Sequence, residues 1–548
     1  MPLPHPWTGN DYACGFPPTI LPELTLRAAS NTIREKPNWW TKLQRPQIVA
    51  RWRKELLDAC AEREERLRIT EPQLDYLFSE LRWLAERREE LVRRQFEEAG
   101  ILDAAEEAVV EVGIDGTRRA DGLIPRALKR RLVECVKRLE DVPQVEKDWH
   151  PGSNKQVLDL VHPSLFPFIA GRTLVTAEDA IPPLDKIGQG EPMDVPPKPN
   201  QHRDMYYSKK FQWLPTDFDV TSPEGRVKAK SYINNLHPEE HKEMYPVLEQ
   251  ILEKFLPMFE EVLGEMQAFV GRKKRFPVDP YDWHGPMPDF GGDYEARCAY
   301  EKVRIPLPIE IPEFTPLPEV PKFDLRNRGS PLQVIVKLAN IVLTPENPRY
   351  EGGTWHVEGM ANDNIAATGI YYYHSDNITE SRLNFRIQVY EPDYEQYDDS
   401  GVLHMYGLVN DGPLVQYLDG IITKQDRCLV FPNIYQHQVQ PFQLEDPTRP
   451  GTRKILVFFL VNPEEPTLST THVPPQQKAW ASRTNAFEQR VLDKLPTELV
   501  NEIYSMVDWP MKLEEAQAFR QELMDERKYL IKDITLDVFE RPFYLCEH

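Results

Sequence analysis

A histidine and a glutamate stand two residues apart in the stretch TWHVEG, at His356 and Glu358, in the most β-rich part of the chain. Side chains in a strand alternate between its two faces, so these two side chains are expected to point to the same side. One face then offers an imidazole and a carboxylate to a single ion. Such a pair supplies two of the three ligands of a 2-His-1-carboxylate site, which holds Fe(II) and leaves positions open for substrate and dioxygen.

The third ligand is predicted 81 residues further on, in RCLVFPNIYQHQVQP, where an apolar run and a turn lead to His437. His374 and His404 are nearby alternatives, but neither is followed by a strand that begins with an arginine. After His437, the stretch GTRKILVFFLV places Arg453 at the head of a strand and on the same face as alternate apolar residues. A buried arginine requires an anion, and a dicarboxylate would bind it through two hydrogen bonds.

The elements that must position these residues are short β-rich runs separated by Gly, Asn, Asp and Pro. Runs of this kind predict a sandwich or a barrel, whereas the segments on both sides show helical periodicity. We therefore predict an α+β protein with four parts. They are an extended N-terminal arm (1–44), a mainly helical and proline-rich wrapping region (45–330), a β-core (331–463) and a C-terminal helical segment (464–548).

Composition limits the classes of partner. The chain has 548 residues, of which 41% are hydrophobic and 28% charged, a balance typical of globular proteins. Its net charge of −21 argues against a nucleic-acid partner. The six cysteines form no CxxC pair, and the sequence has neither a run of about 18 apolar residues nor a secretory signal pattern. We expect an intracellular, cytoplasmic protein without a membrane segment, and its oligomeric state is left open.

The order of these motifs resembles that of the Fe(II)/2-oxoglutarate-dependent dioxygenases, most closely their prolyl-hydroxylase-like branch. The resembling stretches are HVEGMANDNIAATGIYYYH, DRCLVFPNIYQHQVQP and RKILVFFLV, which together cover roughly residues 350–462. The whole chain is also similar to a mainly fungal family of large proteins with a domain of unknown function. That family shares the WHVEG and FPN-x-x-QH stretches.

The resemblance implies a double-stranded β-helix core, jelly-roll or cupin-like, wrapped by N- and C-terminal helices. It also implies an oxygenase that uses Fe(II), 2-oxoglutarate and O2 to oxidise a C–H bond, with release of succinate and CO2. Hydroxylation is the usual outcome, and desaturation or cyclisation are variants. His356, Glu358 and His437 would be the catalytic residues and the metal ligands.

For the co-substrate, the resemblance implies that Arg453 binds the distal carboxylate of 2-oxoglutarate. Tyr372 lies 16 residues after the first histidine and matches a tyrosine that contacts the same carboxylate in prolyl hydroxylases. Thr368 is a further residue that the resemblance assigns to the co-substrate site. The sequence departs from the family in two respects. Its carboxylate ligand is Glu instead of the commoner Asp, and the insertion FQLEDPTRPG lengthens the spacing after His437, so that Arg449 is an alternative to Arg453.

Two other functions fit part of the pattern. A cupin-type metal enzyme that does not use 2-oxoglutarate would keep the three ligands but would give the arginine no carboxylate to bind. A non-catalytic scaffold would use the helical flanks as an interaction surface. The sequence does not decide whether the substrate is a small molecule or a peptide, because fold and cofactor are shared across many substrate classes.

Overall fold

Helices and antiparallel strands are combined in one chain, as expected for an α+β protein. The computed structural model describes residues 3–6, 16–99, 110–177, 183–196, 206–222, 224–268, 274–483, 495–496, 498–499 and 510–545. Its helices are α1 (Leu21–Arg34), α2 (Trp39–Lys42), α3 (Pro46–Cys60), α4 (Glu71–Ala99), α5 (Arg126–Glu140), α6 (Tyr245–Ala268), α7 (Tyr294–Glu301), α8 (Asp399–Tyr406), α9 (Lys478–Arg483) and α11 (Leu513–Ile534).

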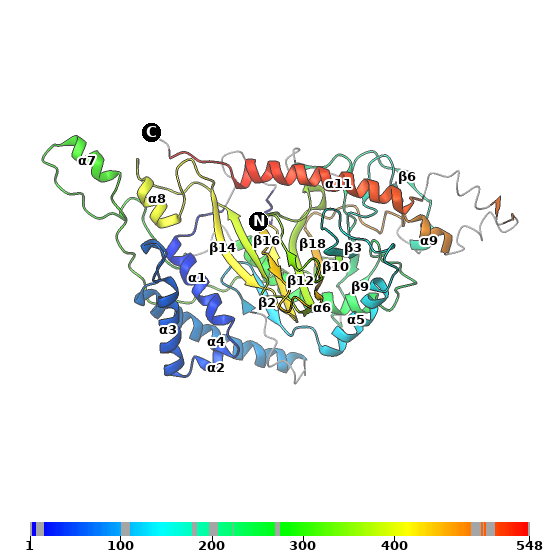
Figure 1. The fold of residues 1–548 in the computed structure, drawn as a ribbon, viewed down its shortest axis with the longest axis horizontal. Coiled ribbons are helices and arrows are strands. Elements are labelled where there is room, and N and C mark those ends of the chain that lie inside the picture. The colour runs from blue at the N-terminus through cyan, green and yellow to red at the C-terminus, as the bar shows by residue number, and fades with distance from the viewer. Residues whose placement is uncertain are drawn as a thin grey trace.

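The larger sheet is built on four strands, in the spatial order β10, β18, β12, β15 (Figure 1). They are β10 (Leu332–Leu343), β18 (Gly451–Val461), β12 (Ile365–Asp376) and β15 (Arg427–Pro432). These strands are rich in Val, Ile, Leu, Phe and Tyr and are largely buried, since both faces of the sheet are covered. All pairs among them are antiparallel.

A smaller sheet faces the larger one and has the order β14, β13, β16. Its strands are β13 (Arg382–Gln388), β14 (Val415–Ile422) and β16 (Gln436–Val439). The two sheets meet through aromatic side chains, because the ring of Phe385 on β13 packs edge-on against Phe431 on β15, with centroids 5.1 Å apart. The inner faces of the two sheets therefore form one core, which also holds the residues singled out from the sequence.

Helix α6 covers the outer face of the larger sheet. Phe255 of α6 packs edge-on against Phe458 of β18, with ring centroids 5.6 Å apart. Next to Phe458 in the sheet is Gly369, and a Cβ at this position would come within 2.9 Å of Phe255 and 2.8 Å of Phe259. The close approach of helix and sheet thus requires glycine at residue 369, because any larger residue would push the two layers apart.

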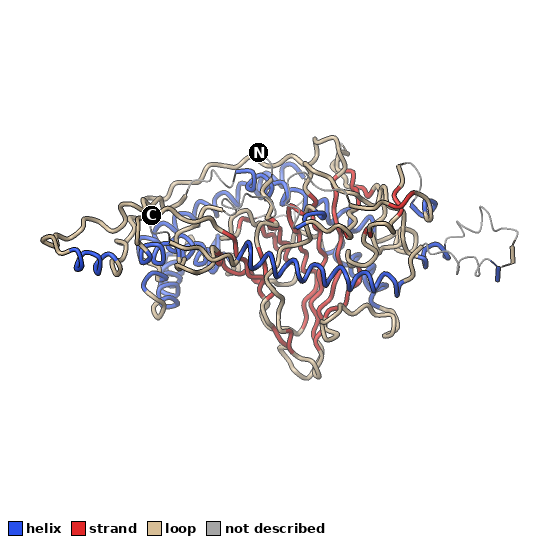
Figure 2. The backbone as a smooth tube through the Cα atoms, turned by 90° about the horizontal axis from the view of Figure 1, so that it is seen from above, coloured by secondary structure: helices blue, strands red, loops and turns tan. Residues whose placement is uncertain are grey.

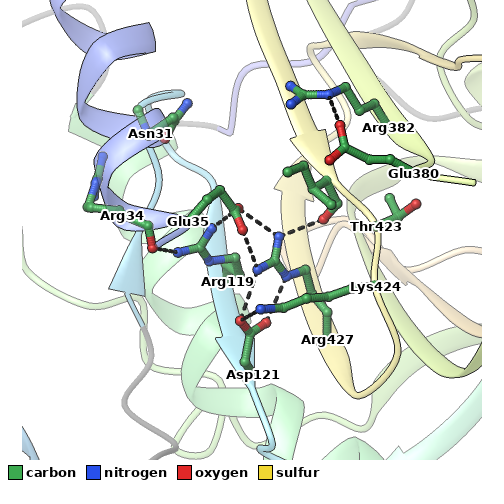
Figure 3. Close-up of polar contacts among 12 residues, drawn as sticks. Asn31, Arg34, Glu35, Arg119, Asp121, Glu380, Arg382, Thr423, Lys424 and Arg427 are labelled. Carbon is green, nitrogen blue, oxygen red and sulfur yellow. Dashed lines mark hydrogen bonds and ion pairs between the residues drawn. The ribbon is translucent and has the colours of Figure 1, made fainter. Parts of the chain in front are cut away.

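A buried network of charges attaches the N-terminal helices to the sheet (Figure 3). Arg427, whose side chain is 0% exposed, forms two hydrogen bonds of 2.8 and 2.9 Å with Glu35, which follows α1. It forms two more, of 2.7 and 2.9 Å, with Asp121. Arg119 also pairs with Glu35. One guanidinium therefore joins three segments that are far apart in the sequence.

The C-terminal helix α11 runs across the top of the strands in Figure 1 and lies over them in the view from above (Figure 2). Two of its arginines, seven residues apart, hold it in place. Arg520 binds Asp148 through two hydrogen bonds of 2.6 and 2.8 Å, and Arg527 binds Asp363 at 2.5 Å. The other helix that periodicity predicts in this segment, over residues 495–507, falls largely outside the described residues.

The region between residues 45 and 330 contributes more than a helical wrapping. Of its described strands, five extend the larger sheet and four form two small pairs. None has more than five residues, which is too short to give a visible alternation in sequence. The extending strands are β1 (Val110–Glu111), β2 (Arg118–Asp121), β3 (Val157–Val161), β8 (Thr216–Asp219) and β9 (Lys228–Ala229); the small pairs are β4 (Phe168–Ile169) with β7 (Phe211–Gln212) and β5 (Leu174–Val175) with β6 (Glu191–Pro192). A further small pair, β11 (Arg349–Tyr350) with β17 (Phe442–Gln443), lies within the β-core.

Two further features concern the outside of the molecule. Helix α7 lies on an arm that reaches away from the main body in both views (Figures 1 and 2). Among the helices that the structure describes, none combines the length and the apolarity needed to cross a bilayer.

Replacement of Arg427 by Met should destabilise the fold strongly, since it leaves the carboxylates of Glu35 and Asp121 largely buried without their main partner. Loss of one member of such a network costs about 3 kcal/mol or more, so we expect the thermal unfolding midpoint to fall by about 2 to 3 °C or more for a chain of this length. Arg382 provides the control, since its pair with Glu380 is exposed and Arg382→Met should change the midpoint little. Equal midpoints for the two variants would contradict this role of Arg427.

Candidate functional site

Two backbone hydrogen bonds bring the HxE segment against strand β16. The amide of His437 donates to the carbonyl of His356 at 2.9 Å, and the amide of His356 donates back at 3.2 Å. This reciprocal pair is an isolated bridge, so the regular strand predicted around His356 is reduced to one residue. Gly352 explains the irregular approach, because its φ of +91° and a carbonyl 2.7 Å from any added Cβ exclude other residues. The two imidazole rings end with centroids 4.3 Å apart.

The three predicted ligands converge within this pairing. Glu358 Oε1 lies 3.3 Å from His437 Nε2 and 3.8 Å from His356 Nε2. All three ligand atoms lie within 4.8 Å of one another. His356 Nδ1 contacts the carbonyl of Thr354 at 2.8 Å and must donate to it, so that its Nε2 retains a free lone pair. The donor set of two imidazoles and one carboxylate therefore fits Fe(II).

The electrostatics of the cluster favour the deprotonated forms that bind a metal. Burial and, to a smaller extent, the neighbouring His437 lower the pKa of His356 to about 4, because the opposing effect of the Glu358 carboxylate is weaker. Burial by itself would raise the pKa of Glu358, but its contacts with His437 and His356 outweigh this effect and hold the pKa at about 2. At neutral pH the site thus presents a neutral His356 imidazole and an ionised Glu358 carboxylate, as metal binding requires.

Two buried side chains that sequence reasoning missed hold the backbone of this loop. Asn433 accepts a hydrogen bond from the Glu358 amide and donates one to the Glu358 carbonyl, both at 2.9 Å. Asp363 accepts bonds from the amides of Met360 and Trp213, both at 2.7 Å, and also binds Arg527 of α11. Asn433 lies within the FPN stretch, so the signal was present in a quoted motif, but its partners depend on tertiary contacts.

Arg453, Tyr372 and Thr368 lie on the inner face of the larger sheet, where Tyr372 pairs with Ile455 and Thr368 with Phe459. All three are buried and carry polar atoms that have no hydrogen-bond partner among the described residues: Arg453 Nε and Nη1, Tyr372 Oη and Thr368 Oγ1. The Arg453 guanidinium lies 4.9 Å from the centre of the Tyr372 ring.

Burial raises the pKa of Tyr372 despite the nearby Arg453, so that its hydroxyl stays protonated and can donate a hydrogen bond. Buried polar groups are nearly always satisfied in folded proteins. An anion with several acceptor oxygens is the class of ligand that would satisfy Arg453 and Tyr372 together.

A family model described as "Protein of unknown function (DUF4246)" matches residues 71–484, about three quarters of the chain, and a model of its N-terminal domain matches residues 2–55. The chain belongs to the DUF4246 family. No curated protein matches it.

Solved structures give weak likenesses to this DUF4246 chain. They include a dioxygenase for auxin oxidation in rice (12% identity, 68% of this chain and 78% of that chain, TM-score 0.23), the Fe(II)/(alpha)ketoglutarate-dependent dioxygenase TqaL (11%, 62% and 91%, 0.20) and IDO from Bacillus thuringiensis (12%, 26% and 50%, 0.17). The chain spans half the length of the last of these. TM-scores this low do not establish a shared fold.

The alternative residues weighed from the sequence lie elsewhere in this DUF4246 chain. Arg449 is half exposed and pairs with Asp376 at 3.0 Å on the surface. His404 lies on α8 and contacts the Ser400 carbonyl at 2.8 Å. His374, at the end of β12, pairs in register with Lys454 and is not part of the group of three ligands described above. The geometry therefore favours His437 and Arg453 over these alternatives.

A second group of potential ligands, His150, Asp159 and His162, lies at the β3 edge of the larger sheet. His150 Nδ1 contacts Asp159 Oδ2 at 2.8 Å, and Nδ1 of His162 accepts a hydrogen bond from the Ser164 amide at 3.2 Å. With its Nδ1 lone pair engaged, His162 carries its proton on Nε2, which is then a donor and not a metal ligand. We interpret this group as a hydrogen-bonded cluster. Sequence reasoning missed it because its residues lie on and beside β3, a strand of only five residues.

The low pKa of His356 can be tested on the metal-free protein by NMR with 13C-labelled histidine, using His356→Gln to assign the signal. We expect the His356 ring signal to stay constant from pH 8 to pH 5.5 and to move only as the pH approaches 4. Because this folded-state pKa lies below the unfolded value of about 6.5, the residue's contribution also makes the fold less stable as the pH falls from 6.5 towards 4. A midpoint near 6.5 would refute the proposed burial effect.

Proposed function

We propose that this protein is an Fe(II)- and 2-oxoglutarate-dependent oxygenase that oxidises a substrate C–H bond, with release of succinate and CO2. One observation carries the proposal. The 2-His-1-carboxylate group His356, Glu358 and His437 shares the inner core with a buried arginine, Arg453, that has two unsatisfied nitrogens. A metal site that shares its core with an unsatisfied arginine matches a co-substrate that chelates the metal at one end and carries a carboxylate at the other.

Strand pairing supports the double-stranded β-helix as the core of this enzyme. Such a fold is a long antiparallel hairpin of eight strands that pair 1–8, 2–7, 3–6 and 4–5 before it rolls into two sheets. The corresponding pairs here are β10 with β18, the His356 segment with β16, β12 with β15, and β13 with β14. We assign the catalytic core to residues 331–463, with the arm 1–44, the region 45–330 and the segment 464–548 around it.

The chain's own residues would prepare the site in three ways. His356, Glu358 and His437 would hold the iron, and Asn433 would keep the Glu358 backbone in place. Arg453, with Tyr372 and Thr368 beside it, would bind and orient 2-oxoglutarate.

The bound iron and co-substrate would supply the oxidising power, since 2-oxoglutarate, dioxygen and the substrate are converted to succinate, CO2 and the oxidised product. Phe431 packs against the His437 ring with centroids 5.0 Å apart and helps to keep water from the metal.

The two rival functions are less consistent with these contacts. A cupin-type enzyme without 2-oxoglutarate explains the three ligands but leaves the donors of Arg453 and Tyr372 unsatisfied. A non-catalytic scaffold explains the helical flanks but not the convergence of two imidazoles and a carboxylate on one point.

Purified protein, loaded with Fe(II) under anaerobic conditions, should convert 2-oxoglutarate to succinate slowly after addition of O2 and without a prime substrate. His356→Ala should abolish succinate formation, since it removes a ligand. Arg453→Ala should weaken 2-oxoglutarate binding about tenfold to a hundredfold by removing the charged hydrogen bonds. Succinate measured by mass spectrometry against 2-oxoglutarate concentration distinguishes the two effects.

Arg449→Ala is the matched control for this experiment, because it removes a nearby arginine that faces solvent, and it should behave as the wild type. Iron binding without any affinity for 2-oxoglutarate would favour the cupin-type enzyme. Absence of both binding events would favour the scaffold.

Asn433→Ala should weaken metal binding about tenfold to a hundredfold although it removes no ligand, because the Glu358 backbone would lose both of its hydrogen bonds to residue 433. Calorimetry with Mn(II) measures this effect, and Asn327→Ala, at an exposed asparagine bound to Asp324, serves as the control. Unchanged Mn(II) affinity in a folded Asn433→Ala variant would show that the loop does not need this anchor.

A further inference from the structure

Strand β10 carries a single charged residue, Lys337, within the apolar sequence LQVIVKLANIVL. In the antiparallel register Lys337 is opposite Val457, and Ile341 is opposite Arg453 on the same strand β18. Residues paired across strands share a face, and so do residues separated by two or four positions along a strand. Lys337 and Arg453 therefore both belong to the inner face of the larger sheet.

The strand register places Lys337 closer than Arg453 to the metal ligands. Val457, the partner of Lys337 on β18, pairs with Ile370 of β12, one inward position from Thr368. Thr368 pairs with Phe431, whose ring packs on His437 with centroids 5.0 Å apart, whereas Arg453 lies three inward positions from the Thr368 partner Phe459. On the other side of β10, Ala339 pairs with Asp159 at the neighbouring sheet edge. Within the described part of the chain, neither Glu358 nor Asp159 comes within ion-pair distance of this half-buried lysine. A cation in such a position is poorly compensated.

The inner face thus has two cations at different distances from the three ligands. Lys337 and the Arg453 partner Ile341 are four residues apart, or about 14 Å along the strand. The Arg453 guanidinium lies over the Tyr372 ring, so its charge is closer to Lys337 than the backbone separation indicates. Tyr372 pairs with Ile455, the inward residue of β18 between Arg453 and Val457. The order along the face is the metal ligands with Lys337, then Tyr372, then Arg453.

We propose that Lys337 binds the 2-oxo acid end of the co-substrate, next to the metal, while Arg453 binds its distal carboxylate. The inference rests on the proposed function and adds a second binding residue to it. It also explains why the inner face of this largely apolar strand contains a lysine, the one charged residue of β10. The resident cation would neutralise the carboxylate that chelates the metal and would hold the 2-oxo acid in one orientation.

The test compares two ligands that differ only at the distal end. 2-Oxoglutarate carries both carboxylates, whereas 2-oxovalerate has the same five-carbon chain with a methyl group in place of the distal carboxylate. Binding of each to the Mn(II)-loaded protein is measured by calorimetry for the wild type, Lys337→Met and Arg453→Met. Lys454→Met is the matched control, because Lys454 is adjacent to Arg453 but pairs with Glu140 instead of facing the core.

Lys337→Met should raise the Kd of both ligands by about tenfold or more, and by a similar factor for each. Arg453→Met should raise the Kd of 2-oxoglutarate alone, and Lys454→Met should change neither. The affinity of Lys337→Met for Mn(II) should be equal to or higher than that of the wild type, since a like charge has been removed near the metal. A misfolded variant would instead bind Mn(II) more weakly.

Three results would overturn the inference in distinguishable ways. If Lys337→Met binds both ligands as tightly as the wild type, the lysine does not contact the co-substrate. If the loss is confined to 2-oxoglutarate, Lys337 acts at the distal carboxylate and not at the 2-oxo acid end. If the wild-type protein binds Mn(II) but neither ligand, the proposed function itself fails, and the role of Lys337 fails with it.

Discussion

The reciprocal backbone pairing of His356 with His437 is the contact on which the rest of the site depends. These residues are 81 positions apart, and their two mutual hydrogen bonds bring the imidazole rings to a centroid distance of 4.3 Å. Because a backbone pair leaves the side chains free, the same contact that joins the two segments also aims both rings at Glu358. The pairing persists because β16 is held in the smaller sheet by β13, and because Asn433 holds the backbone at Glu358. Metal ligands of this type are therefore a product of sheet assembly.

Arg427 and Arg453 are both buried, but their guanidinium groups have different surroundings. Arg427 satisfies its guanidinium with two carboxylates and a backbone carbonyl, so that its charge joins α1 to the sheet. Arg453 has the same charge and a similar burial, yet two of its nitrogens have no partner. An unpartnered buried charge is costly to a fold, and it persists only if something outside the chain compensates it. The contrast between these two residues is the physical basis for proposing a bound anion near Arg453.

The C-terminal helix α11 binds two separate loops, one next to the metal ligands and one next to the histidine cluster at the β3 edge. Arg527 binds Asp363, which orders the loop after the metal ligands, and Arg520 binds Asp148, which precedes the histidine cluster at the β3 edge. The two arginines lie two helical turns apart on one helix, so the spacing of these loops is set by helix geometry. Helical segments that the sequence presents as a wrapping around the β-core thus take part in positioning it.

The sequence by itself determined the types of the site residues, their order and the strands that would carry them. The β-runs after residue 331, the inward position of Arg453 and the shared side of His356 and Glu358 are expected from alternation along strands, whereas the convergence of His437 with these two residues depends on the pairing of distant segments. The same reasoning applied to the lone lysine of LQVIVKLANIVL would have indicated Lys337 as well. Only the tertiary structure decided which short strands extend the sheet, which loops are anchored by Asn433 or Arg527, and that Arg449 faces solvent. These features depend on contacts between residues far apart in the chain, and local periodicity carries no information about such contacts.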